Sequence, residues 1–94
     1  MLKNKEELIK QNIQEIVNSW NPIGLMNICP EDEYEPEINE IVEFVICNKN
    51  INKISLSEEI RKIFNFYFTS VYNSINEVEE DVASKILEKC KNIL

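Results

Sequence analysis

Apolar side chains recur at helical spacing along almost the whole chain. In the first segment they occupy positions i, i+4, i+7, i+8 and i+11, in the series Ile9, Ile13, Ile16, Val17 and Trp20. One face of an α-helix repeats at this interval, whereas a half-buried strand needs strict alternation of apolar and polar residues. No alternating stretch of useful length is present. The pattern therefore predicts an all-α fold.

Breaks in the pattern divide the chain into four helical segments. Asn21-Pro22 ends the first, because the residue before a proline is pushed out of the helical region, and Gly24 can supply a positive φ for the turn. We expect an apolar loop over 20–33 and helices over about 3–19, 34–47, 57–73 and 77–93. At 94 residues, we treat 1–94 as one domain.

Capping signals support two of these helix starts. Ser55 and Glu58 have the spacing of a capping box before the third helix, with Ser57 as an alternative cap. Asn76 and Glu79 repeat that spacing before the fourth helix. We therefore expect both helices to begin with a side chain that accepts a backbone hydrogen bond.

The composition excludes several kinds of function. The formal net charge is −7, which disfavours nucleic acid and anionic membranes as partners and suits a basic protein. No histidine is present, and a single glycine cannot build a phosphate-binding loop. The first residues contain no apolar h-region, so we expect no signal peptide, and no apolar run approaches the roughly 18 residues needed for a membrane span. We expect a cytoplasmic protein.

The candidate nucleophiles lack partners for catalysis. No serine, threonine or cysteine can be paired with a histidine base. Cys29, Cys47 and Cys90 form no C-x-x-C pair, so we expect free thiols in a reducing compartment. Cys47 and Cys90 fall on apolar helix faces and are expected in the core, whereas Cys29 lies in the loop. We predict no catalytic residue, no metal ligand, no cofactor and no enzymatic activity.

Pairs of carboxylates offer an alternative reading as a metal-dependent nucleotide hydrolase. Glu37, Glu40 and Glu43 follow one another at i+3 spacing in the second helix, and the fourth helix has similar pairs at Glu77, Glu80 and Asp81. Opposed carboxylates on helices can hold Mg²⁺ or Mn²⁺. Arg61 is the only arginine that could bind phosphate, and solvated helix faces commonly carry such pairs, so both points argue against this reading.

An acidic cluster surrounds the expected start of the second helix. It consists of Glu31, Asp32, Glu33, Glu35 and Glu37. Acidic residues at a helix start offset the positive end of the helix dipole. Asp32 or Tyr34 can cap this helix, and Pro36 suits its first turn. Five charges exceed what one helix end needs, so the cluster is also a candidate docking patch for a basic protein. The candidate binding residues are Trp20, Glu31, Asp32, Glu33, Tyr34 and Glu35. For Trp20 the alternative is core packing, and for Tyr34 it is a buried ring whose hydroxyl bonds across the loop.

The third helix carries more aromatic residues than one buried face requires. Phe66, Phe68 and Tyr72 lie beside its main apolar stripe. A helix that is apolar nearly all round is either central in its domain or meets another molecule. Besides a basic protein partner, we therefore expect that the chain can form a homodimer through these three residues.

One part of the sequence resembles a known family. The run Trp20-Asn21-Pro22-Ile23-Gly24-Leu25, followed by Pro30 to Ile38, resembles the YugE-like group of short bacterial proteins of unknown function, found in Bacillus-like bacteria. It is also similar to immunity proteins of bacterial toxin systems. The resemblance implies a small all-α fold and marks Trp20, Pro22, Gly24, Asp32, Glu33 and Tyr34, with Asn21 where aspartate is usual. We expect a non-catalytic interaction module whose partner is a basic protein, and the resemblance implies an immunity-like role for it.

Overall fold

The computed structural model describes residues 4–22, 34–48, 50–69, 71–91 and 93. These residues form a small all-α domain with no strand among them, which confirms the predicted fold class. The four helices are α1 (Lys5–Trp20), α2 (Glu35–Cys47), α3 (Lys53–Tyr67) and α4 (Asn76–Cys90). None of the helices described is both long and apolar enough to cross a membrane.

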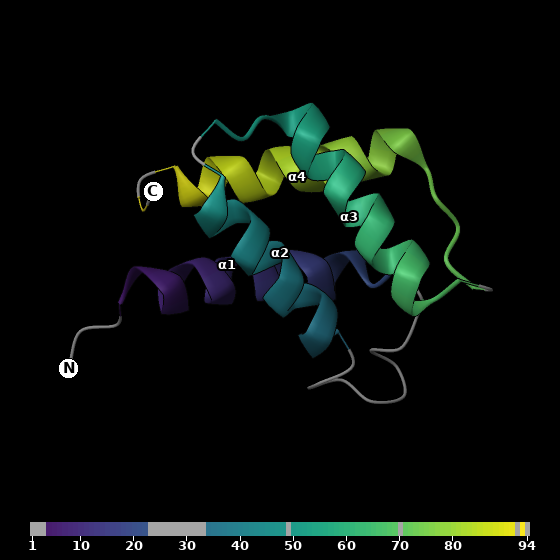
Figure 1. Ribbon diagram of the computed structural model, residues 1–94, viewed down its shortest axis with the longest axis horizontal. Coiled ribbons are helices and arrows are strands. Elements are labelled where there is room, and N and C mark those ends of the chain that lie inside the picture. The colour runs from purple at the N-terminus through teal and green to yellow at the C-terminus, as the bar shows by residue number, and fades with distance from the viewer. Residues whose placement is uncertain (1–3, 23–33, 49, 70, 92, 94) are drawn as a thin grey trace.

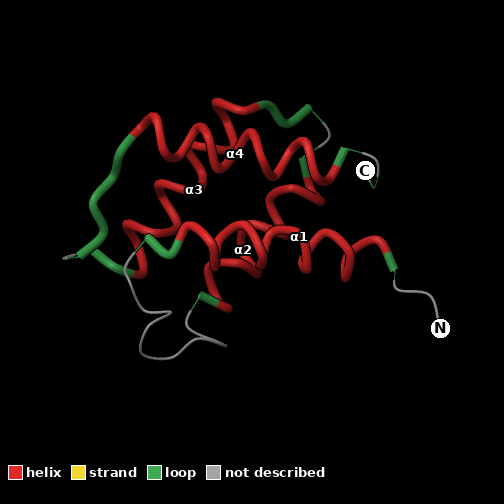
Figure 2. The backbone as a smooth tube through the Cα atoms, turned by 180° about the vertical axis from the view of Figure 1, so that it is seen from behind, coloured by secondary structure: helices red, strands yellow, loops and turns green. Residues whose placement is uncertain are grey.

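The helices are arranged as a ring of neighbours. Each helix packs against the next one along the chain, and α4 packs against α1. Figure 1 shows α1 and α4 running along the long axis of the molecule, with α2 and α3 crossing them obliquely. Figure 2 shows the same arrangement from behind. The core consists mainly of aliphatic side chains from all four helices, among them Ile9, Ile13, Val17, Ile38, Ile41, Val45, Leu56, Ile60 and Ile86.

The start of α3 differs from the prediction by one helical turn. Ser55 N donates to Asn52 Oδ1 at 2.9 Å, and Asn52 N donates to Ser55 Oγ at 3.1 Å. The capping box therefore joins Asn52 to Ser55, and the expected caps at Ser55–Glu58 and Ser57 are wrong. The earlier start buries Leu56 completely, which adds an apolar residue to the core.

The end of α3 also differs from the prediction. The helix stops at Tyr67, not at residue 73. Phe68 follows in a non-helical conformation, and its carbonyl accepts hydrogen bonds from the backbone N–H groups of Val71 and Tyr72. This turn brings Phe68 and Tyr72 back against the core. Burial of the two rings explains why the helix ends although its apolar pattern continues.

The helix α4 begins without the expected side-chain cap. Its N-cap residue is Ile75, and Asn76 is already helical. Asn76 Oδ1 accepts a hydrogen bond from Arg61 Nη2 at 2.5 Å, and Glu79 also turns toward Arg61. The predicted Asn76–Glu79 capping box is therefore wrong, because both side chains bind α3. The helix ends at Cys90, three residues before the predicted end.

A direct hydrogen bond connects the end of α1 to the start of α2. Asn21 has a left-handed conformation with φ 48° and ψ 59°, which asparagine tolerates better than most residues. Its side-chain Oδ1 accepts a hydrogen bond from the Tyr34 hydroxyl at 2.8 Å, so the expected bond across the loop is confirmed. Pro36 lies in the first turn of α2, also as predicted. The positive φ expected at Gly24 falls outside the described residues.

Candidate functional site

The predicted acidic site is only partly described, and its described members have structural contacts. Glu31, Asp32 and Glu33 lie outside the described residues. Glu35 forms an ion pair with Lys10 of α1 at 3.0 Å. Both side chains of that pair are partly exposed, so it contributes at most about 1 kcal/mol. Tyr34 is buried and Trp20 is half-buried, which favours the packing alternative for both.

Trp20 and Tyr34 belong to a cluster of packed aromatic rings. Phe64 lies at its centre, with ring centroids 5.1 Å from Trp20, 6.0 Å from Tyr34 and 5.5 Å from Tyr72. Phe68 stacks on Phe64 at 6.0 Å. Tyr72 is only 9% exposed, and Phe68 packs against the core. Of the three aromatic residues expected at a dimer interface, Tyr72 is therefore buried and Phe68 is half-buried within the domain.

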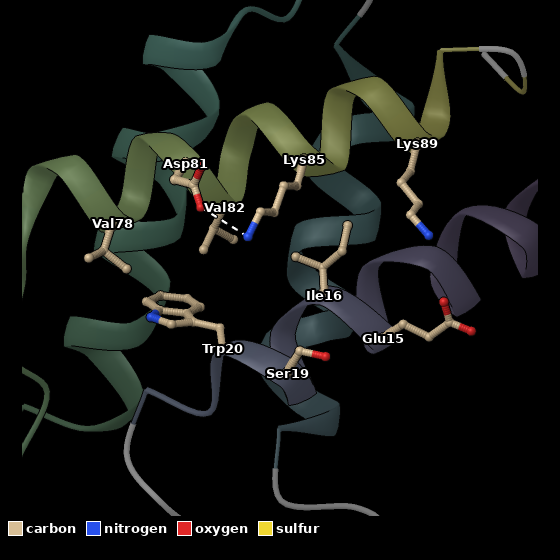
Figure 3. Close-up of a pocket in the computed structure, with 9 residues that line it drawn as sticks. All are labelled: Glu15, Ile16, Ser19, Trp20, Val78, Asp81, Val82, Lys85 and Lys89. Carbon is tan, nitrogen blue, oxygen red and sulfur yellow. Dashed lines mark ion pairs between the residues drawn. The ribbon is translucent and has the colours of Figure 1, made fainter.

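Trp20 also borders a groove between α1 and α4. The groove has a volume of about 370 Å³. As Figure 3 shows, Ile16, Val78 and Val82 lie beside the indole, and Lys85 reaches Asp81 on the rim. The Lys85–Asp81 distance is 3.0 Å. The complete lining is Glu15, Ile16, Ser19, Trp20, Val78, Asp81, Val82, Lys85 and Lys89. The two lysines and two acids leave this groove without net charge.

A buried carboxylate joins α3 to α4. Glu79 is 0% exposed, and its Oε1 accepts from Arg61 Nε at 3.0 Å. Its Oε2 accepts from the Tyr72 hydroxyl and from Ser74 Oγ, the latter at 2.8 Å. Burial, together with the hydrogen bond to Glu79, raises the pKa of Tyr72 well above its usual range. All of these contacts lie within the domain. Through Tyr72 and Ser74 the network fixes the segment between α3 and α4, which we call the α3–α4 link.

A second groove, between α2 and α3, is acidic. It has a volume of about 310 Å³ and is lined by Glu40, Glu43, Phe44, Cys47, Asn48 and Glu59. Three of the six lining residues are glutamates, and none of the six is lysine or arginine. The spacing of Glu40 and Glu43 in the sequence placed them on one side of α2. Sequence reasoning missed Glu59, because only the packing of α3 against α2 brings it to this groove.

An exposed aromatic pair lies at the end of α3. The rings of Phe66 and Tyr67 lie 5.2 Å apart and nearly perpendicular to each other. Phe66 is 77% exposed and Tyr67 is 41% exposed. A hydrogen bond with Glu40 raises the pKa of Tyr67, and the charge of Glu37 adds to the effect. Glu40 therefore belongs both to the groove and to the surroundings of Tyr67. We call Glu40, Glu43, Glu59, Phe66 and Tyr67 the α2–α3 surface.

The ion pairs of the described residues lie elsewhere. Lys10–Glu35 joins α1 to α2, and Lys85–Asp81 lies within α4. Lys53–Glu80 and Arg61–Glu79 both join α3 to α4. No ion pair described here joins α2 to α3. The carboxylates of the α2–α3 surface take part in none of the ion pairs of the described residues.

The thiols and carboxylates offer no grouped metal ligands in the part of the chain that is described. No group of three or more His, Cys, Asp or Glu residues is close enough to hold a metal ion there. Cys90 is buried, as expected, and burial raises its pKa. Cys47 is exposed, so its predicted core position is wrong. It lies at the end of α2, on the side that lines the acidic groove. Cys29 is outside the described residues.

The comparisons with known proteins give no relative: no family model, no curated protein and no solved structure matches the chain.

Proposed function

We propose that this chain is a non-catalytic interaction module that binds a basic protein through its α2–α3 surface. The observation that carries the proposal is a groove between α2 and α3 that is lined by three glutamates and no basic residue. The exposed Phe66 and Tyr67 at the end of α3 support it. The net charge of −7 supports the same kind of partner. The resemblance to immunity-type proteins is consistent with this role, in which the basic partner would be a toxin domain.

The two parts of the α2–α3 surface supply different contributions to binding. Charged groups mainly accelerate association and select partners of opposite charge. Affinity depends more on a few large side chains that become buried at the centre of an interface. Phe66 and Tyr67 can provide such anchors, while Glu43 and Glu59 attract the partner.

The experiment that tests this function compares two charge-reversal variants with the same net charge. The site variant carries Glu43→Lys and Glu59→Lys. The control variant carries Glu15→Lys and Glu88→Lys on α1 and α4. Each variant and the unmodified chain are immobilised at low salt and exposed to an extract of cells that produce the chain naturally. We expect a basic protein to be retained by the unmodified chain and the control, and to be lost with the site variant.

Two results would contradict the proposal. The first is that no basic protein is retained by the unmodified chain. The second is that the site and control variants retain it equally, because attraction would then reflect net charge alone. Circular dichroism of both variants shows whether each is folded, and all four replaced side chains lie at the surface or near it.

A homodimer through α3 is the alternative, and the exposure of Phe66 favours it. Of the three aromatic residues expected at such an interface, Phe66 is the one that remains largely exposed. Two copies meeting at the α2–α3 surface would bring their carboxylates together, which opposes association. Sedimentation distinguishes the alternatives: a dimer at tens of micromolar that Phe66→Ser converts to a monomer would support self-association.

A further inference from the structure

We infer that the groove between α1 and α4 is a second binding surface, and that its occupant is an amphipathic helix of a protein partner. This goes beyond the proposed function, because the groove differs from the α2–α3 surface in the helices that form it and in its charge. The inference rests on the apolar floor around Trp20, on the length of the groove and on the kind of wall that encloses it.

The apolar floor extends beyond the hollow shown in Figure 3. That hollow and a neighbouring one of about 320 Å³ share Trp20 and Val78, so the two adjoin. Ile16 and Val82 continue the floor on one side of the indole, and Ile75 continues it on the other. Ile75 is 48% exposed and Trp20 is half-buried, so the floor offers apolar area that a partner can cover.

The length of the groove matches a helix of ordinary size. Its lining on the α4 side extends from the N-cap residue Ile75 to Lys89, and about 14 helical steps of 1.5 Å span about 21 Å. Figure 1 shows that α1 and α4 both follow the long axis of the molecule, and the two helices are in contact. A third helix of about four turns can therefore lie along the line between them.

The walls of the groove favour a helix over an extended segment. Among the described residues there is no strand, so no strand edge is offered to an extended backbone. An extended segment on this apolar floor would lose water from its N–H and C=O groups without gaining partners for them. A helix bonds those groups internally and presents side chains alone. We therefore expect the partner to carry apolar residues at i, i+3 or i+4, and i+7.

The charged residues on the rim specify the flanks of the partner helix. Lys85 is paired with Asp81 within α4. Lys89 on α4 and Glu15 on α1 are exposed, and neither takes part in an ion pair of the described residues. A helix with an acidic residue on its α4 side and a basic residue on its α1 side would complement both. Because the lining has no net charge, this partner does not need the positive charge that suits the α2–α3 surface.

The test follows the fluorescence of Trp20, the only tryptophan of the chain, during titration with two synthetic peptides of equal composition. The first is an alanine-based helix of about 15 residues with leucines at i, i+4, i+7 and i+11, flanked by one glutamate on one side and one lysine on the other. The second has the same residues in an order that forms no apolar face. We expect the first peptide alone to shift the emission to shorter wavelength, saturably, and to gain helical circular dichroism.

Two pairs of variants show whether the peptide lies in the groove. Ile75→Ser should weaken binding about fivefold, because about half of this side chain becomes buried in the complex. Ile54→Ser is the matched control, since Ile54 is 51% exposed on α3, and it should leave the affinity unchanged. Lys89→Glu should weaken binding about two- to fivefold. Lys62→Glu makes the same change of charge on α3 and should have no effect.

The outcomes that overturn the inference differ from those that overturn the proposed function. Equal binding of the two peptides, no spectral change with either, or equal effects of the groove and control variants would each overturn the groove as a helix-binding site. The Glu43→Lys, Glu59→Lys variant should bind the first peptide as the unmodified chain does. Loss of the peptide in that variant would place it at the α2–α3 surface, which overturns this inference and leaves the basic-partner proposal standing.

Discussion

Glu79 is a charged side chain in a position from which the surrounding residues exclude water. Its negative charge is tolerated because Arg61, Tyr72 and Ser74 all donate hydrogen bonds to it. Such a network is stable only when it is complete, because each buried group that loses its partner carries the full cost of desolvation. The network also explains why the α3–α4 link has a defined shape without a regular helix.

We predict that Glu79→Ala lowers the free energy of unfolding by about 3–5 kcal/mol, since it leaves the Arg61 charge and the Tyr72 hydroxyl without their acceptor. Tyr72→Phe removes one hydrogen bond to a charged group and should cost about 1.5–3 kcal/mol. Glu77→Ala, on the exposed side of the same helix turn, is the matched control and should change stability by less than about 0.5 kcal/mol. Urea denaturation measures all three. A loss below 1 kcal/mol for Glu79→Ala would show that the network does not stabilise the fold.

At the scale of whole elements, the start of α3 depends on one reciprocal cap. Asn52 and Ser55 each accept a backbone hydrogen bond from the other. We predict that Asn52→Ala destabilises the domain by about 1 kcal/mol, as is typical for the loss of an N-cap side chain. Glu58→Ala should be nearly neutral, because Glu58 belongs to the capping box that is not formed. Thermal or urea unfolding of the two variants tests the assignment, and the opposite order of effects would place the helix start one turn later.

The sequence predicted the four helices because each has a continuous apolar stripe, and a stripe depends only on local spacing. It did not predict their ends correctly. Ser55–Glu58 and Asn76–Glu79 have the spacing of capping boxes, but spacing does not decide which of several polar residues binds the backbone. The Glu79 side chain is instead buried and bonded to Arg61, and this contact depends on the packing of α3 against α4.

The same limit applies to the candidate site. Apolar periodicity identified Phe66, Phe68 and Tyr72 as a surplus of aromatic residues, but it could not tell which of them the fold covers. The chain turns after Tyr67 and buries Tyr72, while Phe66 stays exposed. Glu40 and Glu43 could be grouped from their spacing in one helix. Glu59 joins them only through tertiary packing, which no local pattern reports.

For the molecule as a whole, the position of the charges matters more than their sum. A net charge of −7 on 94 residues would give a weak, general attraction to any cation. The described basic residues that form ion pairs do so at the α1–α2 and α3–α4 contacts and within α4, and the carboxylates between α2 and α3 are left without such partners. The resulting field is local, and the partner would be oriented by it as well as attracted.

The two described cysteines allow both the stability of the whole domain and the occupancy of its groove to be measured. We predict that iodoacetamide modifies Cys47 much faster than Cys90 in the native protein, because the Cys47 thiol is exposed and the Cys90 thiol is buried. Cys90 should react only when the domain opens, since it is buried and burial raises its pKa, which lowers the fraction of reactive thiolate. Peptide mass spectrometry separates the two rates. In urea the rates should become similar.

A basic partner bound at the α2–α3 surface should slow the modification of Cys47, because Cys47 lines the same groove as Glu40 and Glu59. It should leave the rate at Cys90 unchanged or lower it through added stability. The control is the Glu43→Lys, Glu59→Lys variant, in which the partner should no longer protect Cys47. Native modification of Cys90 at the rate of Cys47 would contradict the closed core. Undiminished labelling of Cys47 in a saturated complex would place the partner away from the groove.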